Sequence, residues 1–252
     1  MRPLKVIALL FCTAFFLASP ALAGLFDDPA FVPPEGKPVL SLEYFRENAR
    51  FSSKEGAPDV DLSSNYLYAV LSYSGADGGE VFVKAGARDA TLKNFFADKS
   101  DFFGSDALSG GIGLKQSYFI GKNLKIGGLV DYMISQGFTR TKAMTVGGVP
   151  TNERIAVDSP WEVDAAIAFS YIGDWYAPYI GPYLSWQRFK AEMSSPNPAP
   201  GLPASAAAHY SQAQAAGGFV GLEVFRGDFK ADVEAQVSNE TSFGASISYL
   251  FE

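Results

Sequence analysis

The feature that most constrains this chain is an alternation of apolar with polar or small residues that returns many times along the sequence. In 229–237 every odd residue is apolar and every even residue is charged or carries an amide: Phe229, Ala231, Val233, Ala235 and Val237 against Lys230, Asp232, Glu234 and Gln236. Successive side chains of a β-strand point to opposite faces. The alternation therefore predicts a strand with one apolar and one polar face.

Similar stretches follow one another along most of the sequence. Clear alternation predicts strands at 81–88, 124–135, 161–171, 229–237 and 243–251, and weaker alternation predicts strands near 39–54, 58–75, 105–121, 175–193 and 207–226. A membrane-spanning barrel needs this pattern, because lipid-facing positions must be apolar while lumen-facing positions can be polar. A soluble sandwich would also alternate, but with its apolar face turned inward.

The lengths of the connections separate these two folds. They are short after the second, fourth, sixth and eighth predicted strands and long after the first, third, fifth and seventh, around 47–61, 89–106, 138–158 and 192–208. Outer-membrane barrels have short periplasmic turns, longer external loops and an even number of strands. We therefore predict an all-β fold, a closed antiparallel transmembrane β-barrel of about ten strands, with eight or twelve strands as alternatives.

The first residues have the layout of a secretory signal peptide. Arg2 and Lys5 precede an apolar run, and Ala21 and Ala23 form a small-x-small cleavage pattern. The run is shorter than the roughly 20 residues that a membrane-spanning helix needs. We expect residues 1–23 to be removed, 24–38 to form a periplasmic N-terminal extension and 39–252 to form a barrel in the bacterial outer membrane. An uncleaved anchor is the alternative.

Composition excludes several kinds of chemistry. Cys12 is the only cysteine and lies in the predicted signal peptide, so the mature chain has no disulfide, thiol nucleophile or zinc–thiolate site. With Arg2 and Lys5 removed from the 20 basic residues, 18 remain against 27 acidic ones, which argues against nucleic acid as a partner. With a single histidine, we expect no transition-metal site and no cofactor.

Two segments carry a resemblance to known outer-membrane proteins. The stretch 243–251, ending Ser248-Tyr249-Leu250-Phe251, resembles the C-terminal strand of bacterial outer-membrane proteins, although Glu252 follows the phenylalanine. The stretch 177–186 looks like the Pro-Tyr-aliphatic-Gly strand of small barrels of the OmpA-like and opacity-protein type. The resemblance implies a barrel over 39–251 and no specific activity.

Charges of both signs lie on the faces predicted to point into the lumen. The predicted network comprises Lys84, Arg88, Lys125, Asp131, Glu162, Asp164, Glu223, Lys230, Asp232 and Glu234. Unpaired charge in a dry interior is costly, so we expect a paired, hydrogen-bonded lumen. A wet pore lined by both signs is the alternative. No spacing singles out two carboxylates as a catalytic pair.

His209 is the only histidine of the chain, in His209-Tyr210-Ser211. This triplet resembles the His-x-Ser of outer-membrane lipid A deacylases, in which the histidine would be the base and the serine the nucleophile. Gln212 follows here, where that family has asparagine.

Two considerations argue against this chemistry. Counting back from Phe219, which we assign to the lumen, places His209 and Ser211 inward, whereas an enzyme acting on a membrane lipid needs an outward nucleophile. A one-residue slip in the Ala-rich stretch 205–216 would reverse both. In addition, no acidic residue lies between Ser211 and Glu223 to orient the histidine locally.

We therefore predict a barrel without catalytic residues and with a structural or surface-interaction role. A small passive pore is the first alternative, and a lipid A-modifying enzyme using His209 and Ser211 is the second. Bulky residues predicted to face inward favour a filled lumen, because ten strands enclose little more than side chains can fill: Phe82, Tyr179, Tyr183, Phe219 and Phe225. The expected partners are outer-membrane lipid and lipopolysaccharide, and the barrel-assembly machinery.

Overall fold

The structure, a computed structural model, describes residues 27–53, 55, 57–93, 95, 101–146, 148–195, 197–198, 204–212, 216–238 and 241–251. These residues form β-strands and a single 3-10 turn, Ala76–Gly78. No helix in this part of the chain is both long and apolar enough to cross a membrane.

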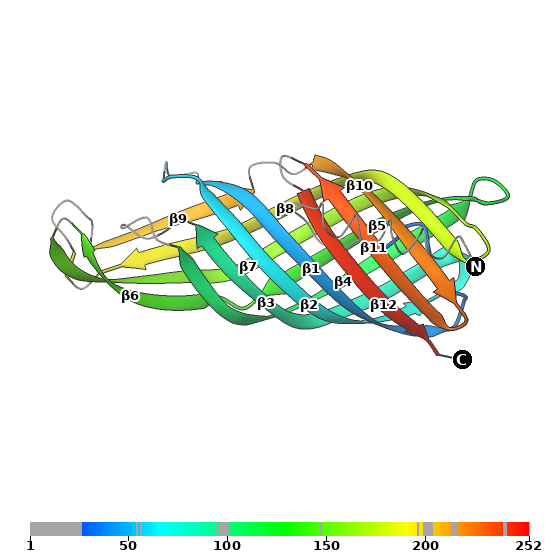
Figure 1. Cartoon of the computed structure of the whole chain (residues 1–252), viewed down its shortest axis with the longest axis horizontal. Coiled ribbons are helices and arrows are strands. Elements are labelled where there is room, and N and C mark those ends of the chain that lie inside the picture. Colours follow the sequence, from blue (N-terminus) through cyan, green and yellow to red (C-terminus); the bar gives the residue numbers. More distant parts are fainter. Residues whose placement is uncertain are drawn as a thin grey trace, which may run out of the picture.

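The strands form one antiparallel sheet that closes on itself (Figure 1). They are β1 Pro38–Ser53, β2 Val60–Ser74, β3 Gly79–Lys93, β4 Phe102–Phe119, β5 Leu124–Ser135, β6 Phe138–Val146, β7 Val149–Tyr171, β8 Tyr176–Ser194, β9 Ser205–Gln212, β10 Ala216–Arg226, β11 Phe229–Val237 and β12 Thr241–Leu250. The order is β12-β11-β10-β8-β9-β1-β2-β3-β4-β5-β7-β6, and the additional pairings of β12 with β1 and of β8 with β7 close the barrel.

Four of these strands behave as two interrupted strands. Both β5 and β6 pair with β7, at its two ends, and both β10 and β9 pair with β8 in the same way. The wall is therefore a ten-strand barrel, and the prediction from the alternation is confirmed. Because Val39 pairs with Leu250, β1 begins and β12 ends at the same end of the barrel, next to the short turns.

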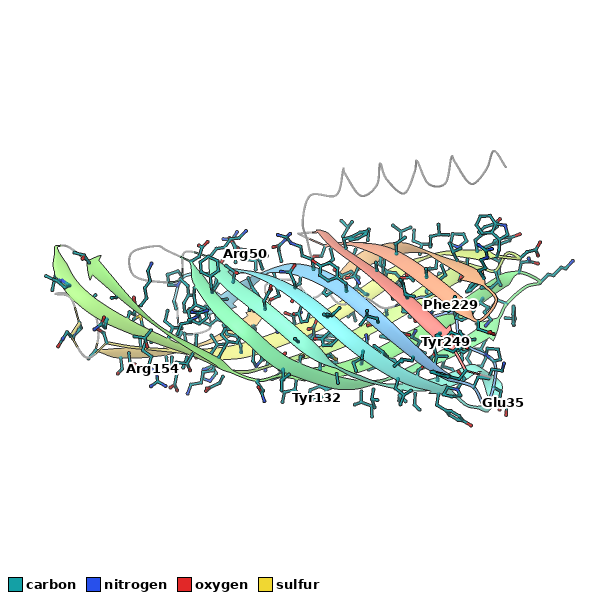
Figure 2. The ribbon with its side chains drawn as sticks, turned by 60° about the horizontal axis from the view of Figure 1, so that its bottom comes forward. Glu35, Arg50, Tyr132, Arg154, Phe229 and Tyr249 are labelled. Atoms are coloured by element: carbon teal, nitrogen blue, oxygen red, sulfur yellow. The ribbon has the colours of Figure 1, made fainter. Side chains whose placement is uncertain are left out.

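The outer face of the wall is apolar over the membrane-spanning part. Leu42, Ile112 and Ile247 are 56%, 57% and 64% exposed, while their inward neighbours are buried. Figure 2 shows Tyr132, Phe229 and Tyr249 on the outer wall of the barrel. An exterior of this kind can be stable only in lipid, and closure pairs the backbone groups that lipid cannot hydrogen-bond.

Beyond the membrane the polarity of the wall is reversed. On β7, Ile155 and Val157 are buried inside, whereas Ile167 is half exposed outside, although all three have odd numbers. A bulge reverses the faces, because Asp158 pairs with Lys190 while Trp161 pairs with Arg188, which leaves one extra residue on β7. The apolar residues thus turn from the lipid to the interior without a break in the sequence alternation.

Three other strands contain a comparable irregularity. On β4 a register shift opposite Arg88 and Ala90 separates inward Phe102 from outward Leu108. Breaks separate β5 from β6 and β9 from β10. The prediction of a long loop at 138–158 is therefore wrong, because most of these residues form the hairpin of β6 and β7. This hairpin projects with β8 and β9 beyond the other strands (Figure 1).

Candidate functional site: a filled lumen and an outward histidine

The middle of the lumen is occupied by a network of buried charges. The Lys84 ammonium lies 3.1 Å from Glu43 and 3.6 Å from Asp131. Arg88 lies 3.5 Å from Glu47, which also accepts hydrogen bonds from Tyr66 and Gln187. The cavity beside Lys84 and Asp131 measures only about 20 Å³, enough for one water molecule.

The structure buries nine members of the predicted network in the interior, namely Lys84, Arg88, Asp131, Glu162, Asp164, Glu223, Lys230, Asp232 and Glu234. Lys125 is half-buried, with its ammonium 5.9 Å from the centre of the Phe31 ring. Sequence reasoning missed how acidic this interior is, since eleven carboxylates and four bases are buried among the residues that the structure describes. Neutral donors such as Tyr179, which bonds Asp232 and Glu234, supply hydrogen bonds where cations do not.

The periplasmic end of the lumen holds part of the segment predicted as a periplasmic N-terminal extension. Of the predicted extension 24–38, the part described from Asp27 lies inside the barrel mouth. Asp27 pairs with Lys115 at 2.9 Å and with Lys230 at 2.5 Å, and Phe31 stacks on Phe225 at 4.9 Å. The ion pairs of Asp27 and the stacking of Phe31 show this placement, and composition carries no signal for it.

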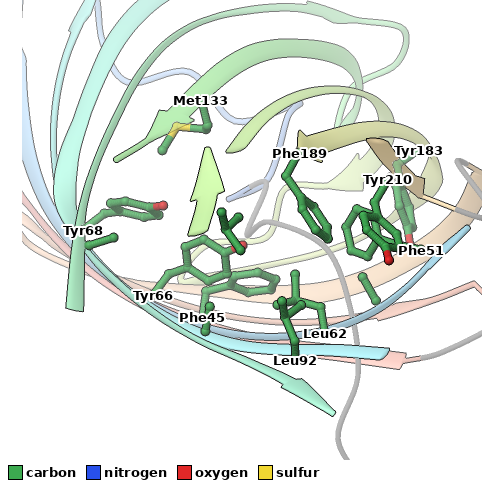
Figure 3. Close-up of a cluster of buried hydrophobic side chains, with 14 of the residues drawn as sticks. Phe45, Phe51, Leu62, Tyr66, Tyr68, Leu92, Met133, Tyr183, Phe189 and Tyr210 are labelled. Carbon is green, nitrogen blue, oxygen red and sulfur yellow. The ribbon is translucent and has the colours of Figure 1, made fainter. Parts of the chain in front are cut away.

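The opposite end of the lumen is closed by apolar side chains (Figure 3). Phe51 contacts Phe189 at a ring distance of 4.9 Å, and Phe189 stacks on Tyr210 at 5.1 Å. Leu62, Leu92 and Ile155 are buried in the same cluster. The lumen is therefore filled by the N-terminal segment, by the charge network and by this cluster in turn.

His209 faces outward, contrary to the predicted parity. Its side chain is 63% exposed, whereas Tyr210 is buried in the lumen. The break between β9 and β10 shifts the register by one, so that Phe219 and His209 lie on opposite faces despite both having odd numbers. Ser211, two residues farther along the same strand, lines the same outer pocket as His209.

The acidic partner that the local sequence lacks comes from another loop. Glu55, between β1 and β2, accepts a hydrogen bond from the His209 backbone N–H at 2.9 Å and contacts His209 Nδ1 at 2.9 Å. These two hydrogen bonds, the backbone one first, lower the pKa of Glu55 to about 2. Glu55 is therefore an anion at neutral pH, next to the imidazole.

Two cations complete this outer site. Arg188 pairs in register with Ser211, and Lys190 pairs with His209, so four outward side chains form a square across β8 and β9. Together with Glu55, Asp158 and Trp161 they line a pocket of about 390 Å³, and Lys190 is ion-paired with Glu192. The Arg188 guanidinium lies 5.7 Å from the centre of the Trp161 ring.

The height of the site follows from the aromatic residues of β7. Tyr171 and Trp161 bound its outward apolar stretch and lie ten residues apart. With about 3.3 Å per residue and a tilt of about 40°, they are roughly 25 Å apart in height, which is the apolar band of an outer-membrane barrel. Because Arg188 pairs with Trp161, the pocket lies level with this end of the outward apolar stretch.

Several solved structures are similar to this chain at low sequence identity. No protein-family model matches the chain, and no curated protein matches it. Similar solved structures include an outer membrane channel from Pseudomonas putida F1 (11% identity over 91% of this chain and 100% of that chain, TM-score 0.43), the outer membrane protein OprG from Pseudomonas aeruginosa (11%, 86% and 97%, 0.41) and Ail, the attachment invasion locus protein of Yersinia pestis (12%, 86% and 100%, 0.34). The first two are described as outer-membrane proteins. The likeness concerns the fold alone.

Proposed function

We propose that the protein is a closed outer-membrane barrel that does not conduct and that functions through its external surface, in a structural or surface-interaction role. The observation that carries this proposal is the packing inside the barrel: the cavity beside Lys84 and Asp131 measures about 20 Å³, Asp27 and Phe31 pack on the periplasmic side, and the aromatic cluster of Phe51 and Phe189 packs on the external side. A structural or surface-interaction role does not require an open path for ions through the N-terminal segment, the charge network and the aromatic cluster.

The test is a planar-bilayer recording of the refolded mature chain. We expect no stable open-channel current, because displacement of the N-terminal segment alone leaves the aromatic cluster in place. A matched variant, Asp27→Asn, should remain silent for the same reason. A stable current with passage of sugars would contradict the proposal and favour the alternative of a small passive pore.

The remaining expectations belong to the same proposal. The mature chain begins at Gly24, after the Ala21-x-Ala23 pattern, and its partners are outer-membrane lipid, lipopolysaccharide and the barrel-assembly machinery. An intact-mass measurement of the protein isolated from membranes tests the cleavage position. Retention of Met1 in the mature protein would contradict it.

A further inference from the structure

The N-terminal segment meets the barrel wall at a cluster of three carboxylates inside the periplasmic end of the lumen. Asp27 comes from this segment, Glu223 from β10 and Asp232 from β11, and one carboxylate oxygen of each lies within 4.8 Å of the other two. We infer that these carboxylates bind one divalent cation, calcium, which bridges the segment to the wall. Binding at this site is independent of whether the lumen conducts.

Strand register and a lysine bring the three carboxylates together. Glu223 and Asp232 are direct partners across β10 and β11, and both face the lumen, where they are 0% and 2% exposed. The Cβ atoms of such partners lie only about 4.5–5.5 Å apart. Lys230 holds Asp27 beside them, because its ammonium lies 2.5 Å from Asp27 Oδ1 and 2.9 Å from Glu223 Oε1. The ligands therefore come from three separate parts of the chain.

Two of these carboxylates keep an oxygen that the protein does not use. The Lys230 ammonium pairs with Glu223 Oε1, and the Tyr179 hydroxyl donates to Asp232 Oδ1 at 2.8 Å. The other oxygens, Glu223 Oε2 and Asp232 Oδ2, are buried and have no hydrogen-bond partner among the residues that the structure describes. A buried acceptor without a partner is costly, and more so when it is charged. A cation between these oxygens removes that cost.

A neutral side chain beside the cluster points to the same ligand. Ser246 lies on β12 directly opposite Asp232, faces the lumen and is 3% exposed. Its hydroxyl also has no hydrogen-bond partner in the described part of the chain. Buried hydroxyls are normally hydrogen-bonded. A cation at Asp232, or a water molecule in the shell of that cation, gives Ser246 the partner that the protein does not provide.

The charges at this end of the lumen have a negative excess. Among the described residues, six carboxylates and three lysines lie here, namely Asp27, Asp28, Glu80, Glu223, Asp232 and Glu234, and Lys115, Lys125 and Lys230. When all of them are ionised, six minus three leaves three negative charges without a partner. Uncompensated buried charge is strongly destabilising. One divalent cation reduces the excess to a single charge.

The donor atoms select the kind of cation. They are oxygens of carboxylates and of one hydroxyl, which suit calcium and magnesium better than transition metals. Oxygens that share a calcium ion lie at most about 5 Å apart, twice the usual calcium–oxygen distance, and the cluster meets this limit. Calcium accepts about six to eight ligands in irregular geometry, whereas magnesium demands a near-regular octahedron. The Asp27 oxygens can bind both lysine and calcium, because each has two lone pairs.

Terbium, a luminescent substitute for calcium, tests the site in the refolded mature protein, freed of metal by a chelator and prepared without lipopolysaccharide. Tyr179, which is hydrogen-bonded to Asp232, is close enough to pass excitation energy to a bound terbium ion. We expect sensitised emission that saturates at one ion per chain and that calcium displaces. Asp232→Asn should weaken the binding of both ions at least about tenfold, since a ligand contributes no less than its outer-shell partners.

Asp164→Asn is the matched control. Asp164 is also 2% exposed in the lumen and also has an oxygen without a hydrogen-bond partner among the described residues, but it lies on β7, outside the cluster. Its replacement should leave the affinity for terbium unchanged. Ser246→Ala, which leaves no buried charge unpaired, serves if Asp232→Asn fails to fold, as judged by the migration of unheated samples on gels. It should weaken binding less than loss of a carboxylate. Absence of saturable emission, or an affinity that neither variant lowers, would overturn the site.

Thermal unfolding separates a bridge from a site on the wall alone. Calcium should raise the unfolding temperature of the mature protein, because it binds the folded state. Asp27→Asn should abolish this increase, because the variant lacks the ligand from the N-terminal segment, and Asp164→Asn should retain it. An increase of the same size in Asp27→Asn would overturn the bridge. The conductance recording tests the closed lumen separately, so failure of one proposal is distinguishable from failure of the other.

Discussion

Ile134 and Phe138 lie four residues apart, one on each part of the interrupted strand β5–β6, yet Ile134 is 46% exposed on the outer wall and Phe138 is 7% exposed inside the barrel. The break between β5 and β6 lies between them. Corresponding irregularities occur on β4, on β7 and between β9 and β10. Together they mark where the apolar residues stop facing lipid and start forming an interior core.

The first prediction concerns the bulge on β7. Deletion of Pro160 removes the extra residue between Asp158 and Trp161 and forces one end of β7 to present the wrong face. We expect little or no folded species in unheated gel samples. Pro160→Ala keeps the residue count and should fold. Normal folding of the deletion variant would show that the bulge does not control the reversal.

The second prediction concerns the lipid face. Val233→Arg should lower the free energy of unfolding by roughly 2–4 kcal/mol if the position is near the bilayer midplane. Asp232→Asn, its inward neighbour, should cost less, because an asparagine oxygen can still accept the hydrogen bond from Tyr179. Urea titrations in lipid vesicles measure both. The opposite ranking would mean that the two faces are exchanged.

The third prediction concerns the N-terminal segment. Asp27→Asn leaves Lys115 and Lys230 without the carboxylate they share. We expect a loss of roughly 3 kcal/mol in unfolding free energy, the lower end of the range for a broken buried pair, because Lys230 keeps its ion pair with Glu223 and the Asp27 side chain is 13% exposed. The exposed Glu35→Gln on the same segment should change stability little. Equal effects of Asp27→Asn and Glu35→Gln on stability would contradict the placement of Asp27 inside the lumen.

The fourth prediction compares two neighbouring glycines. A methyl group at Gly127 would lie 2.1 Å from the Pro29 carbonyl oxygen, whereas at Gly128 the nearest atom is 3.7 Å away. Gly127→Ala should therefore destabilise by about 1–3 kcal/mol through overpacking, while Gly128→Ala should be neutral or stabilise by about 0.4–1 kcal/mol. Similar stabilities for the two variants would mean that the segment does not occupy the lumen.

The fifth prediction concerns pH. Since the pKa of Glu55 is lowered from 4.5 to about 2, its contact with His209 contributes stability above pH 4.5 and loses that contribution as the pH falls toward 2. A carbon NMR titration of the Glu55 carboxyl should show this midpoint. In His209→Ala the backbone bond remains, so the midpoint should move only part of the way back to 4.5. An unchanged midpoint would exclude the imidazole as a cause.

The sequence by itself determined the barrel, its strand number and the lipid face, because a period of two and the requirement for paired backbone in lipid leave few other folds. It also determined which side chains of 229–237 point inward. Tertiary structure alone decided the orientation of His209, because one inserted or unpaired residue reverses every later side chain and leaves no mark in the alternation. It alone decided that Glu55 meets His209 and that Asp27 meets Lys115 and Lys230, because these contacts join segments 154, 88 and 203 residues apart. Such contacts depend on strand register and closure, which local patterns do not contain.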